Sequence, residues 1–180
     1  MNKNIAICWF RQDLRLSDNP ALSAASNHEN LLPIYILDKD NSGENYLGAA
    51  SKFWLHHSLE ALKKSFGGKL WIASGNPIEI LSNLIETYSI KAVYWNRCYE
   101  PWRIKRDKNI KNELSKKNLI VKTYNGSLLW EPWEIRKDDG SPYKVFTPFY
   151  RKAFSNSISP RRPLKIKVNK NIFYIADKNV

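Results

Sequence analysis

Two short stretches of this sequence combine guanidinium, carboxylate, amide and aromatic groups directly after an apolar run. Residues 9–15 read Trp-Phe-Arg-Gln-Asp-Leu-Arg, and residues 95–102 read Trp-Asn-Arg-Cys-Tyr-Glu-Pro-Trp. Arginine forks and carboxylates can hydrogen-bond the edge of a planar ligand, while tryptophan and tyrosine rings can stack on its face. Both stretches are therefore candidates for binding a planar, polar ligand. The alternatives are a surface ion pair for the first and structural packing of tryptophans for the second.

Other familiar kinds of site have less support. Gly67-Gly68 and Gly75 do not form the glycine patterns that cradle dinucleotides or triphosphates. His56 and His57 are neighbours on a predicted helix, where adjacent side chains point in different directions, so we expect no shared metal. No Ser/His/Asp set can be proposed from spacing, because spatial proximity is not readable from it. We assign no catalytic residue.

The elements that must position these groups follow from the apolar pattern. Short runs rich in Ile, Val, Tyr and Trp alternate with helix-period segments, which is typical of a parallel sheet covered by helices. The expected strands are 5–10, 32–37, 69–73, 92–96 and 119–124. Helices are expected from near Pro20, along the stripe 55–66, from Asn76-Pro77, over 102–116 and, shorter, over 148–154. The sequence therefore predicts an α/β fold with a doubly wound, five-stranded parallel sheet and helices on both faces.

Such a sheet binds ligands outside the carboxyl ends of its strands. The loops beginning at Arg11, Asp38, Ser74 and Asn96 should converge there. Both polar and aromatic stretches fall at this edge, which makes it the expected binding site.

Length and charge restrict the remaining organisation. The 180 residues fit one domain plus a tail, and the net charge of +12 favours a polyanionic partner. Residues 151–180 hold +7 of that charge. We expect a globular domain over 1–154 and a basic linker over 155–180, since its prolines and scattered lysines leave little apolar surface to bury.

Cysteine content and hydropathy indicate the compartment. Cys8 and Cys98 cannot form a disulfide framework and lie in apolar runs. No run approaches the ~20 apolar residues of a membrane span. We expect a soluble, cytoplasmic protein with no membrane association.

Several motifs together make the sequence resemble DNA photolyases and cryptochromes. W-F-R-x-D-L-R is followed by Asp-Asn-Pro-Ala-Leu at 18–22, Tyr-Ile-Leu-Asp at 35–38 and Gly-Ala-Ala-Ser-Lys-Phe-Trp-Leu at 48–55. Trp-Asn-Arg at 95–97, Tyr-Glu-Pro at 99–101 and Gly-Ser-Pro-Tyr-Lys-Val-Phe-Thr-Pro-Phe at 140–149 continue the family order. The resemblance covers about residues 4–154, and the ordered set is far more specific than any single motif.

The resemblance implies a light-harvesting role for this domain, which in the family lies near an antenna chromophore, either methenyltetrahydrofolate or 8-hydroxy-5-deazaflavin. It makes ten residues candidates for the antenna side of the fold: Phe10, Arg11, Asp13, Tyr35, Asp38, Lys52, Phe53, Asn96, Arg97 and Glu100. Trp102-Arg103 stands where some folate-binding members carry a carboxylate, and Cys98 where deazaflavin binders often have an acid. The choice of antenna stays open.

The family pattern also implies partners. In it, a separate C-terminal helical domain binds FAD and damaged DNA, and we expect such a domain, on the same or a split chain, to lie beyond Val180. The isolated chain is then expected to be inactive in the repair of cyclobutane pyrimidine dimers. A cryptochrome-type blue-light receptor, a nucleotide-binding α/β protein and a basic nucleic-acid-binding module are the alternatives.

Overall fold

A parallel sheet forms the centre of the protein in the computed structural model, which describes residues 4–39, 47–155, 159–169 and 171–175. Its order is β3-β2-β1-β4-β5, so the chain runs outward from β1 and then returns to the other side of β1. The strands are β1 (Ile5–Phe10), β2 (Asn30–Leu37), β3 (Trp71–Ser74), β4 (Ile90–Asn96) and β5 (Ile120–Tyr124). The predicted five-stranded parallel sheet is confirmed, although β2 and β4 begin earlier than expected.

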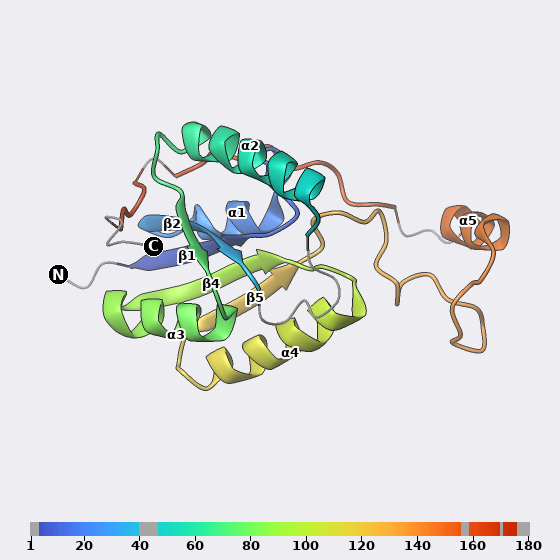
Figure 1. Ribbon diagram of the computed structural model, residues 1–180. Coiled ribbons are helices and arrows are strands. Elements are labelled where there is room, and N and C mark those ends of the chain that lie inside the picture. The colour runs from blue at the N-terminus through green and yellow to red at the C-terminus, as the bar shows by residue number, and fades with distance from the viewer. Residues whose placement is uncertain (1–3, 40–46, 156–158, 170, 176–180) are drawn as a thin grey trace. The chain divides into compact units, whose positions relative to one another are not determined.

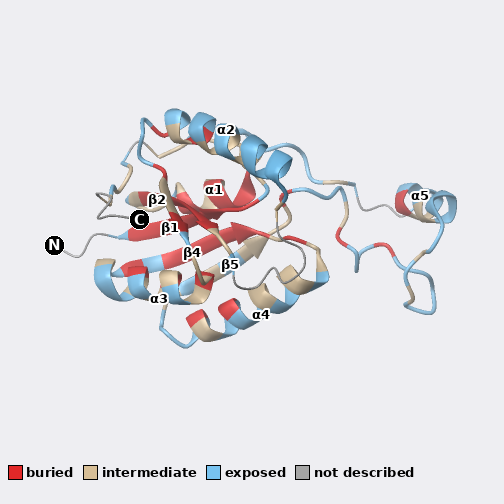
Figure 2. Cartoon of the chain, viewed as in Figure 1, coloured by how far each residue is buried: buried red, intermediate tan, exposed pale blue. Residues whose placement is uncertain are grey.

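Helices cover both faces of the sheet, as predicted (Figure 1). On one face lie α1 (Pro20–Ala25) and α2 (Ala49–Ser65), and on the other lie α3 (Pro77–Tyr88) and α4 (Pro101–Ser115). Each pair shields its own apolar cluster, and the central strands are buried on both sides, as Figure 2 shows. A parallel sheet needs this double cover because its central strands are apolar throughout.

Two helices start where the sequence places a capping asparagine before a proline. The Asn19 side chain accepts a hydrogen bond from Leu22 N at 3.0 Å, and Asn76 accepts one from Ile78 N at 3.2 Å. Proline at the first helical position loses no intrahelical hydrogen bond. None of the described helices is long and apolar enough to cross a bilayer.

Residues 164–169 and 171–175, here called the C-terminal strap, pack against this α/β unit. β3 pairs with β2 only from Ile34 onward, which leaves Leu31 open at the start of β2. The strap fills that position: Leu31 N donates to Asn171 O at 3.0 Å, and Phe173 N donates to Leu31 O at 2.8 Å. Because strand side chains alternate, Ile172 packs on the cluster under α1 and α2, while Phe173 packs on the cluster under α3 and α4.

The strap differs from the basic linker that the sequence predicts over 155–180. The strap belongs to the same compact unit as the sheet and its four covering helices. The composition of the segment did not indicate this packing, because its few apolar residues are spaced among charged ones. In the structure, those apolar residues contact the two apolar clusters of the sheet.

The second compact unit spans Ser127–Pro163 and contains α5 (Phe146–Ser155). Within it, Trp130 meets Phe154 edge to face at 5.6 Å, and Lys152 Nζ pairs with Asp138 Oδ1 at 2.9 Å. The short helix expected over 148–154 is thus present and somewhat longer.

Candidate functional site

A cavity of about 910 Å³ opens at the carboxyl ends of β1 and β2. Its wall is formed by residues 11–16 after β1, residues 35–39 at the end of β2, one face of α2 and the first turns of α4. The order of the strands in the sheet reverses between β1 and β4. The loop after β1 lies at this reversal, which is where open α/β sheets bind ligands. The structure therefore places a cavity at the predicted edge, although the loops after β3 and β4 do not contribute to its wall.

Arg106 of α4 lies between two tryptophan rings in the cavity wall. Its guanidinium carbon is 5.3 Å from the Trp9 ring centre and 5.2 Å from that of Trp102. Its nitrogens reach Asp38 Oδ2 at 2.9 Å and Asp107 Oδ1 at 2.8 Å. Burial alone would lower the pKa of Arg106, but the two carboxylates outweigh it and raise that pKa, so the guanidinium is held charged. Cation-π contacts and charged hydrogen bonds together fix its plane.

Arg11 contributes donors that have no protein acceptor. The side chain is buried, one terminal nitrogen pairs with Asp107, and the guanidinium lies 5.1 Å from the Trp9 ring centre. Among the residues that the structure describes, Arg11 Nε, Arg11 Nη2 and Trp9 Nε1 find no hydrogen-bond acceptor. These three donors are shielded from solvent inside the wall that Arg11 and Trp9 help to form, whereas most buried donors in proteins are satisfied.

Two other lining residues differ in their access to solvent. Tyr35 is almost fully buried, and this burial raises the pKa of its phenol in spite of the opposing charges of Arg103 and Arg106. Lys52, on the first turns of α2, is exposed at the cavity wall. The cavity wall therefore combines a buried phenol with an exposed ammonium group.

A buried polar network supports the loop after β1. Asn96 Nδ2 donates to Asp13 Oδ2 at 2.5 Å and to Asn19 Oδ1 at 2.8 Å, and Asn96 Oδ1 accepts from Ala21 N at 3.2 Å. Asp13 Oδ1 also accepts from Arg11 N at 3.1 Å. The network fixes the backbone from which the Arg11 side chain leaves. Asp13 also lines the cavity, whereas Asn96 and Asn19 act on it only by holding this loop in place.

The structure brings five of the ten predicted residues into the cavity wall, namely Arg11, Asp13, Tyr35, Asp38 and Lys52. Asn96 belongs to the supporting network. Phe10 is buried in the core, edge to face with Phe66 at 5.7 Å, and Arg97 Nη1 donates to the carbonyl oxygen of Thr123 at 2.8 Å.

The remaining two predicted residues are Phe53 on α2 and Glu100 directly before α4. Phe53 is 67% exposed on α2, where its ring contacts that of His57. Glu100 precedes α4 and accepts from Gln12 Nε2 at 2.6 Å. Burial alone would raise the pKa of Glu100, but hydrogen bonds from its own backbone and from Gln12, with the charge of Arg103, lower it.

The sequence reasoning missed the contribution of α4. Trp102, Arg103 and Arg106 line the cavity, and Asp107 pairs with Arg11 and Arg106. The available signal was spacing, because residues three and four apart share one helix face. Trp102 was included in a candidate stretch of the sequence, but that stretch was not extended along the helix to Arg106 and Asp107.

Comparison with known proteins agrees with this architecture. The family model described as DNA photolyase matches residues 6–165. The deoxyribodipyrimidine photo-lyase of Agrobacterium fabrum is 45% identical over 87% of this chain and 33% of its own length. Cryptochrome-2 of Arabidopsis thaliana is 36% identical over 84% of this chain and 26% of its own length. This chain thus spans about a third or less of these relatives.

Solved structures give the same picture. A bacterial class III photolyase from Agrobacterium tumefaciens has a TM-score of 0.84 and 40% identity, covering 98% of this chain and 36% of that one. A Synechocystis cryptochrome, with a TM-score of 0.81 and 21% identity, shares the fold. Since the family model covers most of the sequence and the fold agrees, this chain belongs to the DNA photolyase family.

Proposed function

We propose that this chain is the light-harvesting domain of a photolyase and that its cavity binds a planar antenna chromophore. The observation that carries the proposal is a 910 Å³ cavity at the carboxyl ends of β1 and β2. Its wall brings the guanidinium groups of Arg11 and Arg106 beside the indole rings of Trp9 and Trp102.

The cavity suits a flat molecule with negative charge. Cationic side chains outnumber anionic ones in its wall, which holds Arg11, Arg15, Lys39, Lys52, Arg103 and Arg106 against Asp13 and Asp38. Trp9 and Trp102 supply indole surfaces beside the guanidinium groups. Methenyltetrahydrofolate and 8-hydroxy-5-deazaflavin both combine a planar ring system with acceptor atoms, so both remain candidates for the cavity.

Each group has a role in holding such a ligand. Arg11 supplies positive charge, Arg106 and the indole rings give a rigid wall, and Lys52 neutralises charge at the solvent side. The bound chromophore would supply absorption of blue or near-ultraviolet light. The protein keeps it in one orientation and excludes water from its buried edge.

A titration tests the proposal. Each chromophore is added to the wild-type chain, to Arg11→Gln and to Arg97→Gln, and binding is followed by chromophore fluorescence. Arg97 is the matched control because its guanidinium binds Thr123 on β5. We expect Arg11→Gln to weaken binding about tenfold or more, which corresponds to roughly 1.4 kcal/mol, and Arg97→Gln to leave affinity unchanged. Equal affinity of all three proteins, or no binding of either chromophore, would contradict the proposal.

The complete protein is proposed to be a light-dependent lyase that repairs pyrimidine dimers, with FAD and damaged DNA bound by a C-terminal helical domain. The support is the 45% identity to a deoxyribodipyrimidine photo-lyase, the highest among the relatives described above. This chain alone should therefore show no dimer loss under blue light with reduced FAD. Appreciable repair by this chain would overturn that assignment.

A cryptochrome-type receptor is the second candidate, supported by the 36% identity to Cryptochrome-2. Repair activity of the complete protein separates the two candidates, since a receptor would leave the dimer intact. A nucleotide-binding α/β protein is a third reading, and it predicts that ATP rather than an antenna chromophore binds the cavity.

A further inference from the structure

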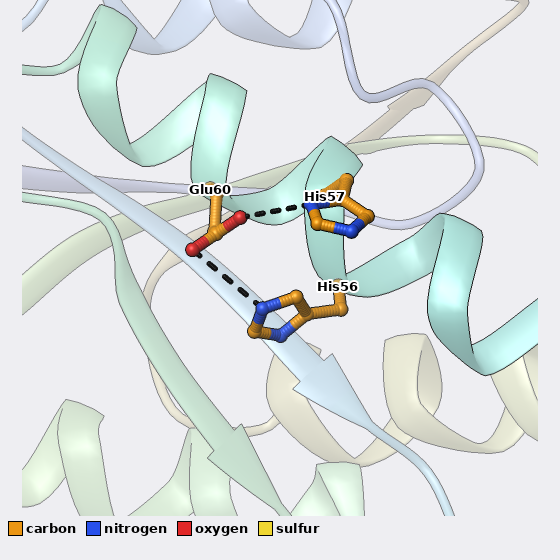
Figure 3. Close-up of side chains that lie close together, drawn as sticks. All are labelled: His56, His57 and Glu60. Carbon is orange, nitrogen blue, oxygen red and sulfur yellow. Dashed lines mark hydrogen bonds and ion pairs between the residues drawn. The ribbon is translucent and has the colours of Figure 1, made fainter.

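The outward face of α2 carries two imidazoles that converge on one carboxylate (Figure 3). His57 Nδ1 lies 3.1 Å from Glu60 Oε2, and His56 Nε2 lies 3.6 Å from Glu60 Oε1. All three side chains are more than half exposed. One potential ligand atom from each residue lies within 4.8 Å of the other two.

Helix geometry explains this convergence. Adjacent positions on a helix ordinarily point in different directions, which is why the sequence argued against a shared metal. In the structure, the rings of His56 and His57 nonetheless meet edge to face at 5.2 Å. Glu60, however, is four residues from His56 and three from His57, and both spacings place side chains on one face. The Glu60 carboxylate therefore lies near both rings. The prediction from the sequence considered the two histidines but not Glu60.

The cluster is separate from the cavity. With 100° of rotation per residue, the cavity-lining residues of α2, such as Ser51, Leu55 and Leu62, share one side, and Glu60 lies opposite them. Phe53 is on the outward side with the cluster, and its ring meets that of His57 edge to face at 4.6 Å. This contact restricts the His57 ring in the position where it faces Glu60.

We propose that His56, His57 and Glu60 form a binding site for a divalent transition metal ion, with Zn²⁺ as the natural probe. Two imidazole nitrogens and one carboxylate oxygen form a ligand set that zinc accepts, with water in the fourth position. Ligands of a tetrahedral zinc are about 3.4 Å apart, given bonds of about 2.1 Å. The separations of 3.1 Å and 3.6 Å from Glu60 are already close to this spacing, and no separation in the cluster exceeds 4.8 Å. The exposure of the side chains permits the remaining adjustment.

The ligand types also determine selectivity. Imidazole favours Zn²⁺, Ni²⁺ and Cu²⁺, whereas Mg²⁺ and Ca²⁺ prefer oxygen ligands. The chain has only three histidines, and the third, His28, contacts Tyr94 and Asn4 on the α/β core. Binding of one zinc equivalent is therefore attributable to the α2 cluster if substitutions there remove it.

Calorimetric titration of the full 180-residue chain, prepared without a histidine tag, tests the site. The proteins compared are wild type, His56→Gln, His57→Gln, Glu60→Gln and the control Glu86→Gln, each titrated with Zn²⁺ and with Mg²⁺. Glu86 is a suitable control because its carboxylate is 67% exposed, close to the 60% of Glu60, and lies on α3 beside Lys117. Circular dichroism verifies that each variant is folded.

We expect wild type and Glu86→Gln to bind one Zn²⁺ with equal, micromolar affinity and to bind Mg²⁺ far more weakly. Loss of either imidazole should weaken Zn²⁺ binding by at least about tenfold, since even outer groups of metal sites contribute 10-fold to 100-fold. Glu60→Gln should also weaken it. Absence of Zn²⁺ binding at millimolar concentration, or Zn²⁺ affinity equal in all five proteins, would overturn the site.

Discussion

Asn96, the last residue of β4, donates a hydrogen bond of 2.5 Å to the carboxylate of Asp13 in the loop after β1. The bond links the end of β4 to the loop after β1, and the order of the strands reverses between β1 and β4. Asp13 in turn accepts from the backbone N–H of Arg11, whose side chain enters the cavity wall. The buried Asn96 amide therefore holds the loop that positions Arg11, a residue proposed to contact the chromophore.

Replacement of this amide should destabilise the domain. Asn96→Ala leaves Asp13 and the N–H of Ala21 without their buried partner, so the free energy of unfolding should fall by about 1–3 kcal/mol. Urea unfolding followed by circular dichroism measures the change. Asn112→Ala, at an exposed position of α4, should change stability by much less. Unaltered unfolding of Asn96→Ala would show that the network contributes nothing.

Gly126 packs against the same amide, and its substitution should be costly for steric reasons. A Cβ at this position would lie 2.5 Å from Asn96 Cγ and 2.7 Å from Asn96 Cβ. Because Asn96 is buried and hydrogen-bonded, it cannot move aside, and Gly126→Ala should destabilise by about 1–3 kcal/mol. Thermal unfolding beside Gly48→Ala, where a Cβ meets nothing within 4 Å, checks the effect. A larger loss in the Gly48 variant would contradict this explanation.

The sequence predicted the sheet well because its signal is local. The first strand, 5–10, is a continuous apolar run and was placed at its observed bounds. Helix starts were also local, since Asn19 and Asn76 each precede a proline and accept a hydrogen bond from an N–H of the first helical turn. Both signals require only neighbours in sequence.

The site was harder to predict because its contacts join distant residues. Arg106 pairs with Asp38 across 68 positions, and no local pattern indicates that pairing. Asn96 was assigned to the ligand because of its position after a strand, yet a side chain there can face either the cavity or the neighbouring loop. The strap was missed for a similar reason, since Ile172 and Phe173 gain their partners only from the folded sheet.

Alkaline pH should reveal the buried phenol of Tyr35. Burial raises its pKa in the folded state, so the unfolded chain, in which tyrosine ionises near pH ~10, is favoured as pH rises above that value. Its contribution is fully present below pH ~10 and is lost as pH rises toward the folded-state pKa. Wild type should therefore lose stability in this range, and Tyr35→Phe should lose less.

Urea midpoints measured from about pH 8 to about pH 11, a range that spans the ordinary tyrosine pKa of ~10, provide this test. Burial also raises the pKa values of Tyr94 and Tyr124, so a smaller alkaline loss should persist in the Tyr35 variant. Tyr150→Phe, which removes an exposed phenol on α5, is the matched control. An identical alkaline slope in wild type and Tyr35→Phe would contradict the assignment.

The C-terminal strap should stabilise the α/β unit through one side chain rather than through its charge. Phe173 packs on the cluster under α3 and α4 and meets Tyr88 edge to face at 5.5 Å, whereas its neighbour Tyr174 is 52% exposed. Alternation along the strap makes the two rings a matched pair on opposite sides of one backbone.

Full truncation of a buried phenylalanine costs about 3–5 kcal/mol, so half-buried Phe173→Ala should cost roughly half of that. Tyr174→Ala should leave the urea midpoint near that of wild type, and hydrogen exchange at Leu31, whose N–H is bonded to the strap, should accelerate only in the Phe173 variant. Equal stability and equal exchange in the two variants would instead identify the strap as a segment that rests on the sheet without stabilising it.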